Sequence, residues 1–216
     1  SPCYFYQSIK LNLGVSQMKH LVKNIATAAT LCVALNAFSA TVTVTGVSGT
    51  GSYNNSVSLI VDGVIPGESS GWTGVSNVWW YGTTPVFTLT FDQIYTLQDV
   101  TVSVDNNDNY RVRTSLDNTN WSNLFSIMSN YGEVGWGMDT MSSVSGSPEY
   151  VSGIDFSATN AKYVQIFATG GDNMYSVGEL AFTGTVVSSV PEPASLALVG
   201  LGLAGLAVAR RRKTQE

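Results

Sequence analysis

Residues 100–115 decide the fold class of this chain, and they read Val-Thr-Val-Ser-Val-Asp-Asn-Asn-Asp-Asn-Tyr-Arg-Val-Arg-Thr-Ser. Apolar and polar side chains alternate through Val100–Val104 and again through Tyr110–Ser115, which is the two-residue period of a strand with one buried face. Between these runs, Asp105–Asn109 contains only Asp and Asn, which favour turns. The segment therefore predicts a strand, a turn and a second strand.

The same pattern continues through residues 40–190, where turn-forming residues separate short runs rich in β-branched and aromatic side chains. None of these runs has a convincing helical period. We expect about nine strands and an all-β fold, a β-sandwich or jelly roll. Besides the two runs above, the candidate strands are Thr41–Thr45, Val57–Val61, Val86–Phe91, Leu124–Met128, Val151–Phe156, Lys162–Ala168 and Glu179–Thr183.

The N-terminal part predicts a secretory signal peptide over residues 18–39. Two lysines and a histidine follow Met18, and a mostly apolar run spans Ile25–Ala37. Small residues then form a cleavage site, so we expect the mature protein to begin at Ala40. The alternative is a retained membrane anchor, although the apolar run is short for a span. Residues 1–17 are interpreted as translated upstream sequence with no role in the fold.

Cleavage before Ala40 removes every cysteine and histidine, because Cys3, His20 and Cys32 all precede it. The mature chain then has no disulfide, no thiolate nucleophile and no thiolate or imidazole zinc site. It also has no histidine to act as the base of a catalytic triad.

The block from residue 40 to residue 190 is strongly acidic. It contains thirteen Asp and Glu residues against three bases, a net charge of −10. Such a charge repels phosphate backbones, so we do not expect a nucleic-acid partner. Hard cations such as calcium are the natural counter-ions.

The C-terminal part has three pieces in a fixed order within residues 190–213: a Pro-Glu-Pro triplet, an uncharged run over residues 194–209, and an arginine cluster. This arrangement resembles the PEP-CTERM sorting signal of exported Gram-negative proteins. The resemblance implies a single transmembrane helix that holds the chain transiently in the inner membrane, an exosortase partner and delivery to the cell surface or matrix. A permanent tail anchor is the alternative, and residues 214–216 form a short tail. The motif consists of Pro191, Glu192, Pro193, Arg210, Arg211 and Arg212.

Three further stretches lie in a distinctive order between residues 50 and 184, and they resemble the discoidin, or coagulation-factor type C, domain. The resemblance implies a galactose-binding-like β-sandwich jelly roll over residues 40–189. Members bind glycans, lipids or proteins through loops at one end, and many carry a structural calcium. This chain departs from the family in lacking a disulfide between its ends. The stretches are Leu59–Gly63 with Ser69–Trp72, Tyr110–Trp121, and Ala161–Ile166 with Val177–Gly184.

The resemblance also implies a calcium site, with oxygen ligands from Asp62, Ser70 and Glu179. Calcium takes six to eight oxygen ligands, so backbone carbonyls or water would supply the others. The alternative is that Asp62 only caps a turn and Glu179 is solvated.

Several aromatic and basic residues are candidates for ligand contact. Trp79, Trp80 and Tyr81 follow one another, so they cannot all face one side of a strand, and we expect Trp80 or Tyr81 to be exposed. Flat rings suit the faces of sugars, whereas the alternative is packing in the core. Trp136 is a further candidate. Arg111 and Arg113 share a strand face and either contact a ligand or pair with an acid.

We therefore expect a non-catalytic, surface-sorted module that binds extracellular carbohydrate or polysaccharide. A structural or adhesion protein that acts through protein contacts is the alternative. A glycoside hydrolase is a weaker one, with Asp105 and Asp108, or Glu133 and Asp139, as its carboxylates.

Overall fold

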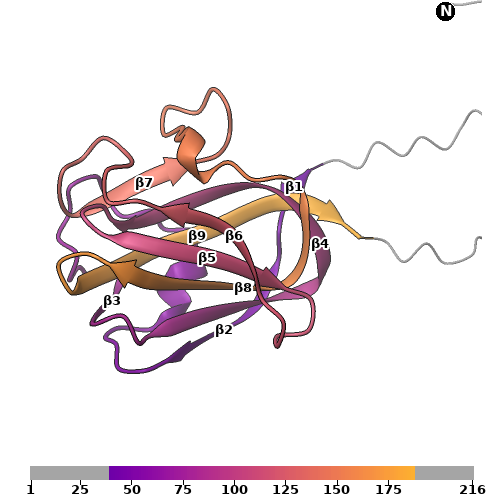
Figure 1. Cartoon of the computed structure of the whole chain (residues 1–216), viewed down its shortest axis with the longest axis horizontal. Coiled ribbons are helices and arrows are strands. Elements are labelled where there is room, and N and C mark those ends of the chain that lie inside the picture. The colour runs from indigo at the N-terminus through magenta and orange to yellow at the C-terminus, as the bar shows by residue number, and fades with distance from the viewer. Residues whose placement is uncertain (1–38, 188–216) are drawn as a thin grey trace, which may run out of the picture. The chain divides into compact units, whose positions relative to one another are not determined.

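The computed structural model describes residues 39–187, which form an all-β fold of nine strands and two short 3-10 helices (Figure 1). The predicted all-β class is therefore confirmed. The strands are β1 (Ala40–Thr41), β2 (Val44–Thr50), β3 (Val78–Tyr81), β4 (Val86–Asp105), β5 (Asn109–Ser115), β6 (Ser122–Ile127), β7 (Met138–Ser142), β8 (Thr159–Gly170) and β9 (Met174–Val186). The 3-10 helices are η1 (Val57–Val61) and η2 (Ser152–Ile154).

Strand β4 belongs to both layers of the sandwich. Its first part pairs with β2 at residues 86–91 and with β8 at residues 87–90, and β8 pairs with it again at residues 95–97. Its second part pairs with β9 from Tyr95 onward and with β7 from Thr101 onward. The register shifts between Thr90 and Tyr95, where residues 92–94 are exposed at a corner. Figure 1 shows β4 curving at the side of the molecule where β1 begins and β9 ends. A bulge of this kind lets one strand turn from one sheet into the next.

The two layers follow from these pairings. One contains β2, β4, β8, β5 and β6, and the other contains β3 and β1 beside β9, then β4 and β7. All of the pairings between named strands are antiparallel, and the predicted β-sandwich is thus confirmed.

The core lies between the layers, where Trp80 forms the centre of an aromatic group. Its ring contacts Phe87, Tyr110 and Tyr175 at centroid distances of 4.9, 6.3 and 5.9 Å. All four residues are buried. Burial of apolar surface stabilises a fold by about 25 cal/mol per Å². Because these four rings bury large apolar areas, the group contributes strongly to the stability of the sandwich.

Two predicted strands are wrong, and two real strands are not among those predicted. The predicted strand Thr41–Thr45 is divided between β1 and β2, and the two predicted over Val86–Phe91 and Val100–Val104 are parts of the single strand β4. Val57–Val61 forms η1, because Ser56 caps its first turn and only Ile60 is fully buried. Val151–Phe156 contains η2 instead of a strand. Short apolar runs do not distinguish a strand from one helical turn until a partner strand is present. The two strands missed were β3 and β7.

The predicted signal peptide and sorting helix lie outside the described residues. Within residues 39–187, no helix is both long and apolar enough to cross a membrane.

Candidate functional site

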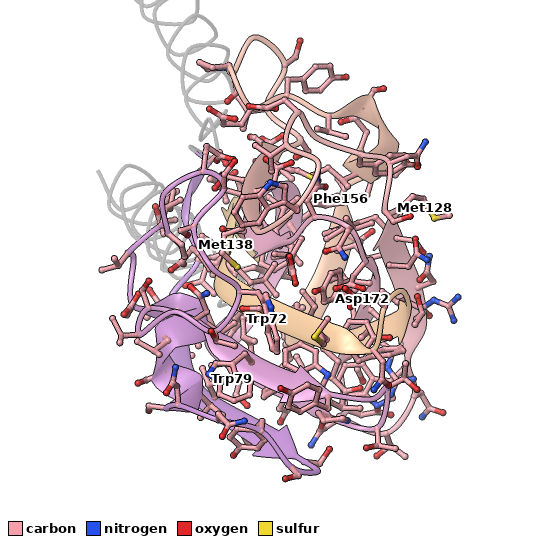
Figure 2. All side chains as sticks on the ribbon, turned by 90° about the vertical axis from the view of Figure 1, so that its left-hand side faces the viewer. Trp72, Trp79, Met128, Met138, Phe156 and Asp172 are labelled. Atoms are coloured by element: carbon pink, nitrogen blue, oxygen red, sulfur yellow. The ribbon has the colours of Figure 1, made fainter. Side chains whose placement is uncertain are left out.

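The turns of one end of the sandwich surround an aromatic cluster formed by Trp72, Trp79 and Tyr81. The three rings contact one another edge to face, with centroids 5.4 to 5.9 Å apart. Tyr81 is 56% exposed, and both tryptophans are half-buried. Figure 2 looks onto this end and shows Trp72 and Trp79 side by side. The cluster presents apolar ring surface to solvent together with the Tyr81 hydroxyl.

Alternation along β3 explains which rings reach the surface. Trp79 and Tyr81 are on one face of the strand, opposite Ser176 and Met174 of β9, whereas Trp80 faces the core. The expectation of an exposed ring therefore holds for Tyr81. It is wrong for Trp80, which is completely buried and cannot contact a ligand at the surface.

Trp72 enters the cluster from the preceding loop, and two asparagines hold that loop in place. The amide nitrogen of Asn77, which is 1% exposed, donates to the carbonyls of Gly71 and Trp72 at 3.1 Å each. The amide of Asn55 donates to the carbonyls of Gly74 and Asn77 at 2.9 and 2.8 Å. Asn55 and Asn77 are positioning residues that the sequence analysis did not identify.

The other candidate ligand residues are not part of the aromatic cluster. Trp136 is 64% exposed and makes no recorded ring contact with the cluster. Arg111 is exposed on β5. Arg113 shares that face, but its guanidinium is 5.1 and 5.0 Å from the rings of Trp121 and Phe167, and its Nε donates to Gln165. Arg113 therefore has structural partners, as one of the two alternatives expected, but they are two aromatic rings and an amide oxygen instead of an acid.

The structure brings together two of the three residues predicted to bind calcium. Glu179 is buried and accepts a hydrogen bond from the backbone nitrogen of Gly63 at 3.0 Å. Burial, and then the charge of Asp62, raise the pKa of Glu179 to about 7. Glu179 also lines a pocket of about 200 Å³ together with Gly63. A buried carboxylate beside a second acid is a donor set that suits a hard cation.

Ser70 has no recorded contact with these two acids. Its backbone carbonyl accepts from Met138, and its backbone packs against Gly137. Within residues 39–187, no group of three or more Asp, Glu, His or Cys side chains is arranged to hold a metal ion. A calcium ion at Asp62 and Glu179 would therefore need several neutral oxygen ligands.

A separate group of acids lies in and beside β7, and it consists of Glu68, Glu133, Asp139 and Glu149. Asp139 is fully buried, and burial together with the neighbouring Glu68 raises its pKa to about 7. Burial and Glu149 raise the pKa of Glu133. The raised pKa values of Asp139 and Glu133 mean that the neighbouring carboxylates disfavour the ionised forms of these two acids. This group contains the second carboxylate pair considered for hydrolysis, Glu133 and Asp139.

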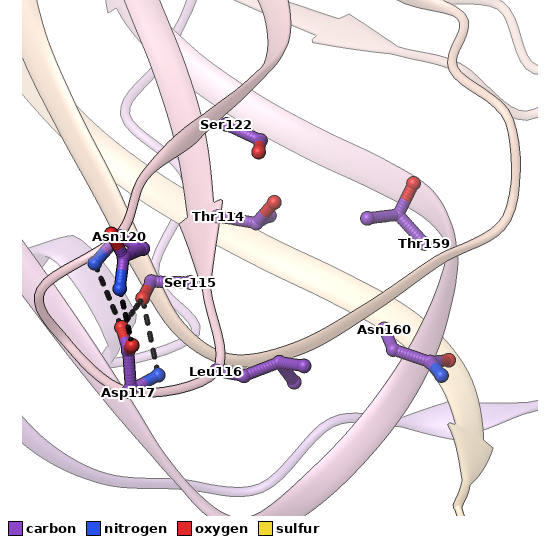
Figure 3. A pocket seen from close by; sticks show the side chains of 8 residues that line it. All are labelled: Thr114, Ser115, Leu116, Asp117, Asn120, Ser122, Thr159 and Asn160. Carbon is purple, nitrogen blue, oxygen red and sulfur yellow. Dashed lines mark hydrogen bonds between the residues drawn. The ribbon is translucent and has the colours of Figure 1, made fainter.

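A polar pocket of about 290 Å³ lies at the β5–β6 turn (Figure 3). Its carboxylate, Asp117, already accepts hydrogen bonds from the backbone nitrogens of Thr119 and Asn120 and from the side chains of Ser115 and Asn120. These bonds hold the pKa of Asp117 well below its usual range. The pocket has polar groups but no aromatic ring, and its carboxylate is occupied by the turn itself.

The PEP-CTERM protein-sorting motif matches residues 189–213. The predicted sorting signal is thereby confirmed, and it indicates export and sorting to the cell surface. The motif covers only the C-terminal part of the chain. Among curated proteins, no sequence matches this chain.

Several solved structures are similar to the chain. The CBM32 module of AlyQ in complex with 4,5-unsaturated mannuronic acid is 17% identical, with 66% of this chain and 97% of that chain covered and a TM-score of 0.49. A pectin-binding carbohydrate binding module is 15% identical, with 70% and 96% covered and a TM-score of 0.43.

A third similar structure is CpGH89CBM32-5 from Clostridium perfringens, in complex with GalNAc-beta-1,3-galactose. It is 17% identical, with 63% of this chain and 93% of that chain covered and a TM-score of 0.42. At these identities and TM-scores the likeness alone does not assign a ligand, so the function is argued from the residues of this chain.

Proposed function

We propose that this protein is exported, sorted to the cell surface through its C-terminal motif, and there binds extracellular carbohydrate without catalysing a reaction. The aromatic cluster of Trp72, Trp79 and Tyr81 carries this proposal. It is a group of one exposed and two half-buried rings at one end of the sandwich, and it faces solvent next to polar turns.

The chemistry of the cluster suits a sugar. One face of a pyranose ring presents C–H groups, which pack against a flat aromatic ring, while its hydroxyls need hydrogen-bond partners at the edge. The Tyr81 hydroxyl is one such partner. Asn173, which is exposed and whose backbone carbonyl accepts from Gly82, lies in the neighbouring turn and is another. The rings are already packed against one another, so little side-chain freedom is lost on binding.

The negative charge of the domain is expected to favour neutral glycans over acidic ones. Thirteen acids against three bases in residues 40–190 give a field that repels uronic-acid polymers. We therefore expect neutral glycans to bind more tightly than acidic ones at low ionic strength. The difference shrinks as salt screens the field.

The test is a binding screen of the purified chain against neutral and acidic polysaccharides, with Tyr81→Ala as the test variant. Removing the exposed ring is expected to weaken binding at least about tenfold, which corresponds to roughly 1.4 kcal/mol. Trp136→Ala is the matched control, because Trp136 is also an exposed aromatic side chain in a loop but lies outside the cluster. It should bind like the unchanged chain.

Equal binding by Tyr81→Ala and the unchanged chain would refute a role for the cluster. Failure of every polysaccharide to bind would favour the alternative of a surface protein that acts through protein contacts. Release of reducing sugar during the screen, lost in Glu133→Gln, would favour the hydrolase and contradict the non-catalytic assignment.

A further inference from the structure

Two acids are buried where β4 meets β5: Asp105 is the last residue of β4, and Asp108 lies in the turn that follows. Asp105 is 2% exposed and Asp108 is completely buried, although a turn made only of Asp and Asn would ordinarily be solvated. Buried carboxylates are costly unless hydrogen-bond donors or cations surround them. The position of these two side chains therefore needs a physical explanation.

Hydrogen bonds satisfy only part of these carboxylates. The backbone nitrogen of Asp172, in the β8–β9 turn, donates to Oδ1 of Asp108 at 3.1 Å. The backbone of Gly137 also hydrogen-bonds Asp105, and the Tyr110 hydroxyl hydrogen-bonds Asp108. Oδ1 of Asp105 and Oδ2 of Asp108 remain buried without a partner of good geometry. The β8–β9 turn closes directly over the site, because a Cβ at Gly171 would collide with the Asp108 carboxylate.

Neutral oxygens beside the two acids are also without partners. The side-chain nitrogen of Asn106, the residue after Asp105, donates to the carbonyl of Val134, while its Oδ1 is buried and accepts no hydrogen bond. The hydroxyl of Ser176 is buried and unpartnered as well. Ser176 lies close by, since its backbone nitrogen donates to the Tyr110 hydroxyl and the next residue, Val177, pairs with Val104 of β4.

The charges around the site are all of one sign. The charged groups that act on Asp105 and Asp108 are these two acids themselves and Asp172, and no base contributes. Burial, followed by its acidic neighbours, raises the pKa of Asp105 to about 6, and burial raises that of Asp108 to about 7. Four buried side-chain oxygens without hydrogen-bond partners thus belong to residues in and beside this turn, and the charges that act on the two acids are negative.

We propose that Asp105 and Asp108, with the side-chain oxygens of Asn106 and Ser176, bind a divalent cation of the calcium type. The donor set is entirely oxygen, which selects hard cations, and its mixture of carboxylate, amide and hydroxyl ligands suits calcium, which accepts six to eight oxygens in a flexible geometry. Two carboxylates form its centre, which is consistent with the absence of a group of three within residues 39–187. Asp172 adds charge from the rim, and water completes the shell.

This cation links the turns next to the aromatic cluster. Ser176 pairs with Trp79, and Met174 of the same strand pairs with Tyr81. Figure 2 shows Asp172 at the same end of the sandwich as Trp72 and Trp79. Binding of the cation at β4, β5 and β9 would therefore hold rigid the strand on which two rings of the cluster depend. The site is distinct from the one predicted at Asp62 and Glu179, and it does not require that the cluster bind sugar.

The experiment measures calcium binding to the chelator-treated chain at pH 8, where both acids are ionised, by calorimetry and by Tm. The unchanged chain is compared with Asp108→Asn, which keeps an oxygen for the Asp172 nitrogen but removes a charge. We expect Asp108→Asn to bind one calcium fewer per chain, or to bind it about 100-fold more weakly. Its Tm in chelator should equal or exceed that of the unchanged chain, because a source of repulsion is gone.

Two controls separate this site from other effects. Asp155→Asn changes an exposed acid elsewhere and should leave stoichiometry and Tm unchanged. Terbium luminescence gives a second readout on the unchanged chain alone, since Tyr110 and Trp80 lie close enough to sensitise a lanthanide held by Asp108. Calcium should displace that signal.

The proposal is overturned if Asp108→Asn binds calcium with the stoichiometry and affinity of the unchanged chain. It is also overturned if the unchanged chain shows neither a calcium-dependent rise in Tm nor terbium luminescence. If Asp108→Asn fails to fold, Asp105→Asn is the second variant, because it removes the other buried carboxylate and leaves Glu179 unchanged; it should lose the same calcium equivalent, and calcium binding equal to that of the unchanged chain would overturn the proposal. Sugar binding through Tyr81 is measured separately, so either proposal can fail without the other.

Discussion

Asn77 offers a sharp test of how the aromatic cluster is positioned. Its amide nitrogen makes two hydrogen bonds of 3.1 Å to the carbonyls of Gly71 and Trp72, and the side chain is 1% exposed. Asn77→Ala removes both bonds, which are partly buried, so water replaces them only in part. At about 1 kcal/mol for each bond lost, the free energy of unfolding should fall by roughly 2 kcal/mol. For a chain of this size, that corresponds to a drop in Tm of about 4–8 °C.

Asn55 provides the matched comparison. Its amide also makes two hydrogen bonds, and they are shorter, but one of them is exposed to solvent. Asn55 has a φ of 68°, so Asn55→Gly removes the side chain without forcing an ordinary residue into the left-handed region. Because water can replace the exposed bond, Asn55→Gly should cost less than about 1 kcal/mol.

Urea unfolding of both variants, followed by tryptophan fluorescence, measures the two costs, and the glycan screen measures the consequence for Trp72. We expect Asn77→Ala to weaken binding as well as stability, since the loop that carries Trp72 loses its buried tie. Equal losses of stability in the two variants would refute the reasoning, because burial would then make no difference. A loss below about 0.5 kcal/mol for Asn77→Ala would refute it as well.

Three further predictions follow from single features of the structure. Trp80→Ala should lower the free energy of unfolding by about 3–5 kcal/mol in urea, while Trp136→Ala changes it by less than about 0.5 kcal/mol, because only Trp80 is buried. The pKa of Asp117 is lowered in the folded chain, so its contribution to stability is full above the unfolded value of 3.8 and is lost as the pH falls below that value. The Tm of Asp117→Asn should therefore fall less steeply than that of the unchanged chain between about pH 4 and pH 2. An equal slope in the two proteins would contradict this prediction. Glu179→Gln should abolish one calcium-dependent increment of Tm while leaving the increment that depends on Asp108, and calcium binding identical to that of the unchanged chain would exclude a site at Glu179.

The sequence predicted the strands whose pattern is purely local. Residues 86–91, 100–104 and 110–115 alternate because each has one face in the core, and that period is visible without any knowledge of the partner strand. Val57–Val61 was misassigned for the opposite reason, since a short apolar run becomes a strand only if another strand lies beside it. In β7, Met138–Ser142 is buried on both faces and therefore shows no alternation to recognise.

The candidate site was predicted less completely than the fold. Because three consecutive aromatics cannot share a face, the sequence predicted that Trp80 or Tyr81 is exposed, and only the structure shows that it is Tyr81. Trp72 joins the cluster through a loop that folds back over β3. Asn77 and Asn55 carry no sequence signal as positioning residues, because their partners are backbone carbonyls of that loop. Arg113 was considered for a ligand, yet its neighbours Trp121 and Phe167 come from the β5–β6 turn and from β8.

By itself, the sequence determined the all-β class, the sorting motif at residues 189–213 and the chemistry open to residues 40–190, which contain no Cys or His. These properties depend on composition and on local period, which do not change when the chain folds. Only the tertiary structure decided that Trp80 is buried and Tyr81 exposed, and that Asp105 and Asp108 face inward with oxygens that nothing satisfies. Burial and unmet hydrogen bonds are properties of what lies beside a residue in space, and here some of those neighbours are far away along the chain, as Tyr175 is from Trp80 and Asp172 is from Asp108.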